Sequence, residues 1–256
     1  MEDTFIMMNK TIAVIGENLL AKRVVGALEK KVKGIILFNE FSLLEQADLV
    51  IETTNLHIEE KKRNLQQIES IVSPDTCILS SILHVSATEA ASWLQQPDRL
   101  VGFAAFADFY EHDLVEVALP LQADLRCLQY VQSMFQLLGI ETEVVEDEVG
   151  LVFPRILSLI INEAAFALTE GTASAYDIDQ AMKKGTNYPL GPFEWCEKIG
   201  LDDVYAVLAG LYKQYGEERY RPAPLMKKLV YAGWIGGEKD KCFYHYQNRN
   251  IKEFSL

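Results

Sequence analysis

Apolar runs of strand length alternate with segments of helical periodicity along residues 10–146. Lys10–Gly16 is a β-rich run closed by glycine, and the apolar residues of Leu19–Leu28 then recur at helical spacing. Strands that alternate with helices in this way are typical of a parallel sheet. Further strands are predicted at Gly34–Asn39, Ala47–Thr54, Thr76–Ile82, Arg99–Phe106, Leu114–Leu119 and Glu141–Glu146, and further helices at Glu59–Val72, Thr88–Leu94 and Leu125–Leu138.

After Glu146 the pattern becomes purely helical. Gly171 follows a long apolar helical segment, Ser174 and Asp177 have the spacing of a capping box, and Gly185 is a further helix stop. The pattern therefore predicts an α/β domain with a mostly parallel sheet over residues 1–147. An all-helical domain is predicted over residues 148–256.

The chain is acidic, with 24 Lys and Arg residues against 37 Asp and Glu residues and a formal net charge of -13. This charge repels phosphate backbones and anionic headgroups, and no basic stripe in the sequence offsets it, so we expect no nucleic acid and no membrane partner. Met1–Lys10 lacks the features of a secretion signal. The cysteines are far apart without a CxxC pair and predict reduced, mostly buried thiols in a cytoplasmic protein: Cys77, Cys127, Cys196 and Cys242.

The second half of the chain contains the most specific pattern. It reads INEAAFALTEGTASAYDIDQAMKKGTNYPLGPFEW from Ile161, followed by IGLDDV and RPAPLMKKLVYAGWIG. These segments resemble the C-terminal domain of the 3-hydroxyacyl-CoA dehydrogenases in order and spacing. In the first half IAVIG, ADLVIE, PDTCILSS, PDRLVGF and LVEV resemble the cofactor domain of the same family. The resemblance implies a Rossmann domain that binds NAD(H), a helical domain that dimerises, and oxidation of a 3-hydroxyacyl thioester.

The turn after the first strand departs from the dinucleotide fingerprint G-x-G-x-x-G. The second glycine of that pattern lets the backbone approach the pyrophosphate, and the third lets the helix pack on the strand. The three positions are here Gly16, Asn18 and Ala21, so the Asn18 side chain would project toward the pyrophosphate. Asn39 falls near the position of the acidic residue that holds the ribose hydroxyls, and the resemblance also places Lys61 in the cofactor site. Gly16 has a purely structural interpretation too, since any such turn needs its conformational freedom.

The segment between the second and third strands, residues 40–46, is also too short for a long helix plus an additional strand of the kind that the family has. We therefore expect the sheet to be trimmed on the side that would face the adenosine. With Asn18 in the turn, this predicts weakened cofactor affinity.

The catalytic positions that the resemblance implies have lost their chemistry. In the family a histidine takes the hydroxyl proton, a glutamate orients it, and serine and asparagine side chains hold the oxygen. The histidine position is Ala104, the serine position is Leu83 and the asparagine position is Pro154, whereas the orienting glutamate remains as Glu116. Alanine, leucine and proline side chains offer no proton and no hydrogen-bond donor. We therefore predict a catalytically impaired or inactive family member, an interaction module that pairs through its helical domain with itself or with an active relative.

One alternative is an active NAD-dependent oxidoreductase with a rebuilt base, either His84 or His112, working with Glu116. Each histidine also has a structural interpretation, as a loop residue near the surface. A different alternative is a chain that binds acyl-CoA or another anion without turnover.

The cations that such an anion site requires are few in the sequence. Lys61, Lys183 and Lys184 are the candidates. No pair of histidines or carboxylates has the spacing of metal ligands, so no metal site is predicted.

Overall fold

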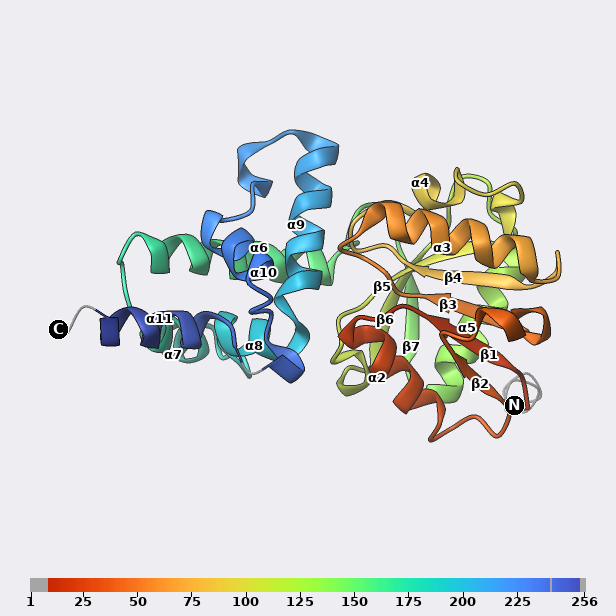
Figure 1. The fold of residues 1–256 in the computed structure, drawn as a ribbon, viewed down its shortest axis with the longest axis horizontal. Helices are drawn as coiled ribbons and strands as arrows, with labels where there is room; N and C mark the ends of the chain where they lie inside the picture. The colour runs from red at the N-terminus through yellow and green to blue at the C-terminus, as the bar shows by residue number, and fades with distance from the viewer. Residues whose placement is uncertain (1–8, 240, 254–256) are drawn as a thin grey trace. The chain divides into compact units, whose positions relative to one another are not determined.

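The computed structural model describes residues 9–239 and 241–253, and the chain divides into two compact units, Met1–Phe153 and Pro154–Leu256. The first unit contains a seven-stranded sheet in the order β2-β1-β3-β4-β5-β6-β7 (Figure 1). Neighbouring strands are parallel except for β5 and β6, so the mostly parallel sheet predicted from the sequence is confirmed. The strands are β1 (Ile12–Ile15), β2 (Ile36–Phe38), β3 (Leu49–Glu52), β4 (Cys77–Ser81), β5 (Leu100–Ala104), β6 (Leu114–Ala118) and β7 (Glu141–Val144).

Helices cover both faces of this sheet. Val14 and Leu79 belong to one buried core together with side chains of α2 and α5. The intervening strand residues, such as Ala13 and Val50, are also fully buried, because α3 and α4 pack on the sheet as well. The continuous apolar runs of the sequence therefore reflect strands buried on both sides. The helical segments are α2 (Leu19–Leu28), η1 (Phe41–Gln46), α3 (Ile58–Ile71), α4 (Ala87–Ala91), η2 (Pro97–Arg99), η3 (Phe109–Glu111) and α5 (Leu125–Leu138).

The β2 edge of the sheet is short. The six-residue 3-10 helix η1 connects β2 to β3, and β3 lies on the other side of β1. The described residues therefore contain no strand beyond β2, which agrees with the trimmed sheet expected from the length of residues 40–46.

The second unit is helical throughout its described residues. Ser174 accepts the Asp177 N–H at the start of α7, as the capping box predicts. The prediction that Gly185 stops this helix is wrong, because Asn187 adopts the left-handed conformation (φ 60°) that ends it. The segments are α6 (Phe153–Thr169), α7 (Ala175–Thr186), α8 (Pro192–Ile199), α9 (Leu201–Tyr215), η4 (Glu218–Tyr220), α10 (Pro224–Tyr231), η5 (Gly237–Lys239) and α11 (Phe243–Glu253).

A buried carboxylate contacts the LGPFEW segment, residues 190–195, at the start of α8. Asp179 is fully buried, accepts the N–H groups of Phe193 and Glu194 (2.8 and 3.1 Å), and accepts the Tyr244 hydroxyl (2.6 Å). A Cβ on Gly191 would lie 2.3 Å from Asp179, so glycine is required at that position. Burial raises the pKa of Asp179, and its three hydrogen bonds oppose that rise.

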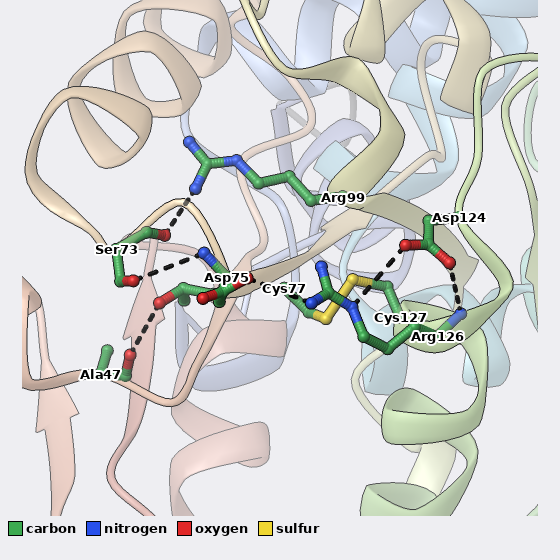
Figure 2. The surroundings of a disulfide bond; sticks show 9 residues. Ala47, Ser73, Asp75, Cys77, Arg99, Asp124, Arg126 and Cys127 are labelled. Atoms are coloured by element: carbon green, nitrogen blue, oxygen red, sulfur yellow. Dashed lines mark hydrogen bonds and ion pairs between the residues drawn. A yellow bond between two sulfur atoms is a disulfide. The ribbon is translucent and has the colours of Figure 1, made fainter.

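The cysteines correct one expectation from the sequence. Cys77 on β4 and Cys127 on α5 form a disulfide, with Cα atoms 5.5 Å apart (Figure 2). Sequence separation of 50 residues gave no indication of this contact, which only the packing of α5 on the sheet produces. Cys196 and Cys242 are buried free thiols, as predicted, and burial together with their mutual contact raises the pKa of Cys196 well above its usual range.

A search of the described residues finds no helix that is long and apolar enough to cross a membrane. Residues 1–8, in which a secretion signal was judged absent from the sequence, lie outside the described residues. The cytoplasmic location stays a prediction.

Candidate functional site

The turn between β1 and α2 is held closed by its own side chains. Gly16 has φ 141°, and a Cβ there would lie 2.1 Å from Thr53 Oγ1, so only glycine fits. The Asn39 amide meets the Gly16 backbone twice, accepting its N–H (2.9 Å) and donating to its carbonyl (3.0 Å). Asn39 itself adopts φ 55°, a conformation that asparagine tolerates better than most residues. Asn39, which was expected to hold a ribose, therefore bonds to the backbone of the turn instead.

Asn18 is the N-cap residue of α2. Its Oδ1 accepts the Ala21 N–H (3.0 Å) and the Thr53 hydroxyl (3.1 Å), and its Nδ2 donates to the Thr53 carbonyl (2.7 Å). This side chain thus takes a backbone donor at the helix N-terminus, the kind of group that otherwise binds phosphate. The amide of Asn18 also stands where a second glycine would leave room for the backbone to approach the pyrophosphate. The residues at this turn do not fit a bound dinucleotide.

Lys61 is not placed to contact a cofactor, which corrects the expectation drawn from the resemblance. Its side chain is fully buried and forms an ion pair with the equally buried Glu52. The Lys61 ammonium also donates to the carbonyls of Thr54 (3.1 Å) and Ser81 (2.7 Å). Lys61 therefore ties α3 to the ends of β3 and β4, and its charge is neutralised within the fold.

The positions of the lost catalytic groups are occupied by apolar, buried side chains. Ala104 ends β5 and is 4% exposed, and Leu83, just after β4, is fully buried. Pro154 lies in the first turn of α6, where a missing N–H leaves no hydrogen bond unmade. None of these three side chains can take up or release a proton.

Glu116 is retained, and it has a structural role. It stands opposite Ala104 in the β5–β6 pairing and is 8% exposed. Its carboxylate accepts the backbone N–H groups of Val152 (2.7 Å) and Phe153 (2.9 Å), at the residues where α6 begins. A carboxylate at a helix N-terminus satisfies donors that the helix leaves unpaired. This explains why Glu116 remains although its histidine partner is alanine.

A cavity of about 360 Å³ opens beside Ala104 and Glu116. His112 also lines it, together with aromatic side chains that include Phe109 and Phe153. The His112 ring packs edge-on against Phe153, with ring centroids 5.5 Å apart. We call this space the β5–β6 cavity.

An acidic partner accompanies His112 in this region. His112 Nε2 lies 3.4 Å from Oδ2 of Asp108, a carboxylate that is 3% exposed, whereas the imidazole is 36% exposed. The structural interpretation of His112 from the sequence, as a loop residue near the surface, did not include Asp108 as its partner. The structure therefore brings Ala104, His112 and Glu116 together around one cavity.

His84 is placed differently. Its Nδ1 lies 2.9 Å from the Asn55 carbonyl, which ties the loop after β4 to the loop after β3. Among the described residues that line the β5–β6 cavity, His84 does not appear. Its interpretation as a loop residue with a structural contact is the one that the structure favours.

Two of the three lysines named as candidate cations for an anion site form ion pairs within the fold. Lys183 contacts both carboxylate oxygens of Glu194 (2.8 and 2.9 Å). Burial opposes ionisation of Glu194, but the Gly191 N–H and the Lys183 ammonium together lower its pKa. With Lys61 buried as well, only Lys184 of the three lysines named from the sequence lies exposed without such an ion pair in the described structure.

Basic side chains gather at one place in the fold. Lys22, Arg23, Lys30 and Lys31 line a common cavity beside α2. The first pair and the second pair are separated by six residues, so they form no continuous basic stripe in the sequence. Among the described residues, no group of three or more His, Cys, Asp or Glu side chains could hold a metal ion.

Comparison with protein families matches most of both units. The family model for the NAD binding domain of 3-hydroxyacyl-CoA dehydrogenase covers residues 8–148, and the model for its C-terminal domain covers residues 150–246. The chain is 31% identical to the 3-hydroxybutyryl-CoA dehydrogenase of Bradyrhizobium diazoefficiens over 92% of this chain and 82% of that protein.

Two further relatives point the same way. The 3-hydroxybutyryl-CoA dehydrogenase of Clostridioides difficile is 32% identical, over 93% of this chain and 87% of its own length. The crystal structure of (S)-3-hydroxybutyryl-CoA dehydrogenase PaaH1 from Ralstonia eutropha superposes with a TM-score of 0.70 at 28% identity, and the match covers 91% of this chain and 97% of that chain.

Proposed function

The chain belongs to the 3-hydroxyacyl-CoA dehydrogenase family, and we propose that it lacks normal dehydrogenase activity and acts as an interaction module. The observation that carries this proposal is the apolar character of the three lost positions, Leu83, Ala104 and Pro154. Proton transfer by a positioned side chain contributes about 10²- to 10⁴-fold to such reactions. Each of the three positions lacks a group that could supply it.

The closed turn after β1 supports the same proposal. The Asn18 and Asn39 amides bond to the backbone that would otherwise meet the cofactor. A nicotinamide dinucleotide would have to displace these contacts before binding there. The family's cofactor domain is thus kept as a fold, while its cofactor affinity is reduced.

The helical unit supplies the surface for interaction. Ile156, Tyr176 and Tyr231 expose 53%, 60% and 78% of their area. Exposed tyrosine and isoleucine side chains are common in protein interfaces, where their burial contributes binding energy. The partner in this proposal is another chain of the same family, either a second copy or an active relative. Size-exclusion chromatography with light scattering measures the assembly, and Tyr231→Glu should weaken it.

Cofactor binding gives the most direct test. We expect calorimetric titration with NADH to give no heat at millimolar concentration from the β1–α2 turn. We also expect reduction of acetoacetyl-CoA with NADH to be at least about 100-fold slower than with the Clostridioides difficile relative as a positive control. Reduction at a rate comparable to that relative, lost on Glu116→Ala, would refute the proposal.

A second candidate is an active oxidoreductase in which His112 is the base. The observation that favours it is the position of His112, which lines the same cavity as Ala104 and Glu116 and contacts Asp108. In this candidate the neutral imidazole of His112 would take the proton of a substrate hydroxyl, and the Asp108 carboxylate would stabilise the imidazolium that forms. NAD⁺, when bound, would supply the acceptor for the hydride that leaves the same carbon.

The two candidates differ in their dependence on pH and on one side chain. If His112 is a base, activity rises with pH as the imidazole loses its proton, and it falls at least about 100-fold in His112→Gln. His84→Gln is the matched control, since His84 lies away from the cavity, and it should leave the rate unchanged. A residual activity that is equal in His112→Gln and the unmodified chain removes this candidate.

A further inference from the structure

A second cavity, of about 320 Å³, lies beside α2 in the first unit. Lys22 and Arg23 on the helix and Lys30 and Lys31 just beyond its end line this cavity. Positions 22, 23, 26, 27 and 30 share one face of a helix, which explains why residues of α2 and of the turn after it converge. We call this space the α2 cavity.

The charge of the α2 cavity is opposite to that of the whole chain. Four cationic side chains surround it in a protein with a formal net charge of -13, and no acidic residue is among its described lining residues. At physiological ionic strength charges farther than about 8 Å are largely screened, so the groups around the cavity determine its local potential. The sequence places Glu29 beside Lys30 and Glu111 beside Tyr110, but the lining itself contains four cations and no carboxylate, which favours anions over cations as ligands.

Gly26 forms part of the wall of this cavity and has no packing reason to be glycine. A Cβ added there would meet no atom within 4 Å. Glycine in a helix interior costs about 0.5–1 kcal/mol relative to alanine. Together with Ala27, Gly26 keeps the space between the cationic side chains open. Glycine therefore makes the helix less stable at the position where a larger side chain would fill the cavity.

The remaining wall is apolar and aromatic. Tyr110 on η3, Leu138 at the end of α5 and Ile140 before β7 complete the lining. Tyr110 is 45% exposed, and its ring stands edge-on to Phe109. Such a surface suits the planar base of a nucleotide, which stacks on aromatic side chains.

We propose that the α2 cavity binds a nucleoside polyphosphate, with its phosphates among Lys22, Arg23, Lys30 and Lys31 and its base against Tyr110. Four cations match the charge of a di- or triphosphate, and Arg23 can contact phosphate oxygens in a bidentate manner. The site is separate from the β1–α2 turn and does not depend on the proposed function. It is a binding site and involves no chemical step.

The test is calorimetric titration with ATP at low ionic strength. We expect saturable binding, and about tenfold weaker binding in Lys30→Gln with Lys31→Gln, since each lost charge contact is worth up to about 1 kcal/mol. Lys227→Gln with Lys228→Gln removes two adjacent exposed lysines of α10 in the second unit and is the matched control. Absence of ATP binding to the folded chain at millimolar concentration would overturn the proposal.

Gly26→Met tests the cavity itself. Methionine favours helix, and the open space at Gly26 accommodates it, so the variant should be at least as stable as the unmodified chain. We expect it to weaken ATP binding more than tenfold by filling the cavity. ATP binding that survives in this variant would place the nucleotide elsewhere and refute the assignment.

Two further titrations define the ligand. Inorganic triphosphate should bind at least tenfold more weakly than ATP, because it lacks the base that stacks on Tyr110. Equal affinity would contradict a nucleotide site. Any heat from NADH that persists in Gly26→Met arises at the β1–α2 turn and counts against the proposed function only, whereas heat that disappears belongs to the α2 cavity.

Discussion

Reduction of the Cys77–Cys127 disulfide lowers the free energy of unfolding of the first unit by about 4 kcal/mol. The bond closes a loop of 50 residues, and the loss of that constraint in the unfolded chain gives this magnitude in the chain-entropy account. Both sulfur atoms lie in the core shared by the sheet and α5. Denaturant unfolding with and without reductant measures the difference.

The control for this prediction is Cys77→Ala with Cys127→Ala. That variant should be less stable than the oxidised protein, and adding reductant should not change its stability further. The exposed pair Arg126–Asp75 also joins α5 to the segment before β4, at 3.1 Å (Figure 2). Arg126→Met should cost less than about 1 kcal/mol, since exposed ion pairs contribute little. An unmodified chain whose unfolding midpoint ignores reductant contradicts the prediction.

Replacement of Lys61 by methionine costs about 3–5 kcal/mol, because it leaves the Glu52 carboxylate buried without its counter-charge. Glu52 is fully buried and also accepts the Thr54 N–H (2.8 Å) and the Ser80 hydroxyl (2.9 Å). Those two hydrogen bonds cannot compensate for a lost ammonium group. The free energy of unfolding, from urea titration, is the measured quantity.

Two further variants separate burial from simple loss of a charge. Glu52→Gln combined with Lys61→Met removes both charges and should recover most of the stability, because no buried charge is then unpaired. Lys10→Met removes one partner of the Lys10–Asp48 pair, which is about one-third exposed, and should cost at most about 1 kcal/mol. Equal losses of unfolding free energy in Lys10→Met and Lys61→Met would contradict the larger cost expected for the buried pair.

The order of strands and helices follows from the sequence because hydrophobic periodicity is a local property. Lys10–Gly16 contains β1, Leu19–Leu28 coincides with α2, and Leu125–Leu138 coincides with α5. Errors arise at ends, as where Asn187 instead of Gly185 terminates α7. Ends depend on the backbone conformation of single residues, which competing caps decide.

The candidate site was predictable only in part. The identity of the side chain at Ala104 or Leu83 is read directly from the sequence once the family pattern is aligned. The partner of His112 could not be read from the sequence, because the contact with Asp108 depends on the conformation of the η3 segment. Likewise the sequence suggested that Asn18 disturbs the turn, but not that Thr53 would fix it there.

The sequence by itself determined the family and the α/β and helical architecture, and it predicts that the family's histidine, serine and asparagine are replaced by Ala104, Leu83 and Pro154. Only the tertiary structure decided which polar groups meet: Cys77 with Cys127, Lys61 with Glu52, Glu116 with the start of α6, and four cations around the α2 cavity. The physical reason is the separation along the chain between the residues that interact. Periodicity and side-chain identity act over a few residues, whereas disulfides, buried ion pairs and cavities require contacts between segments that are distant along the chain.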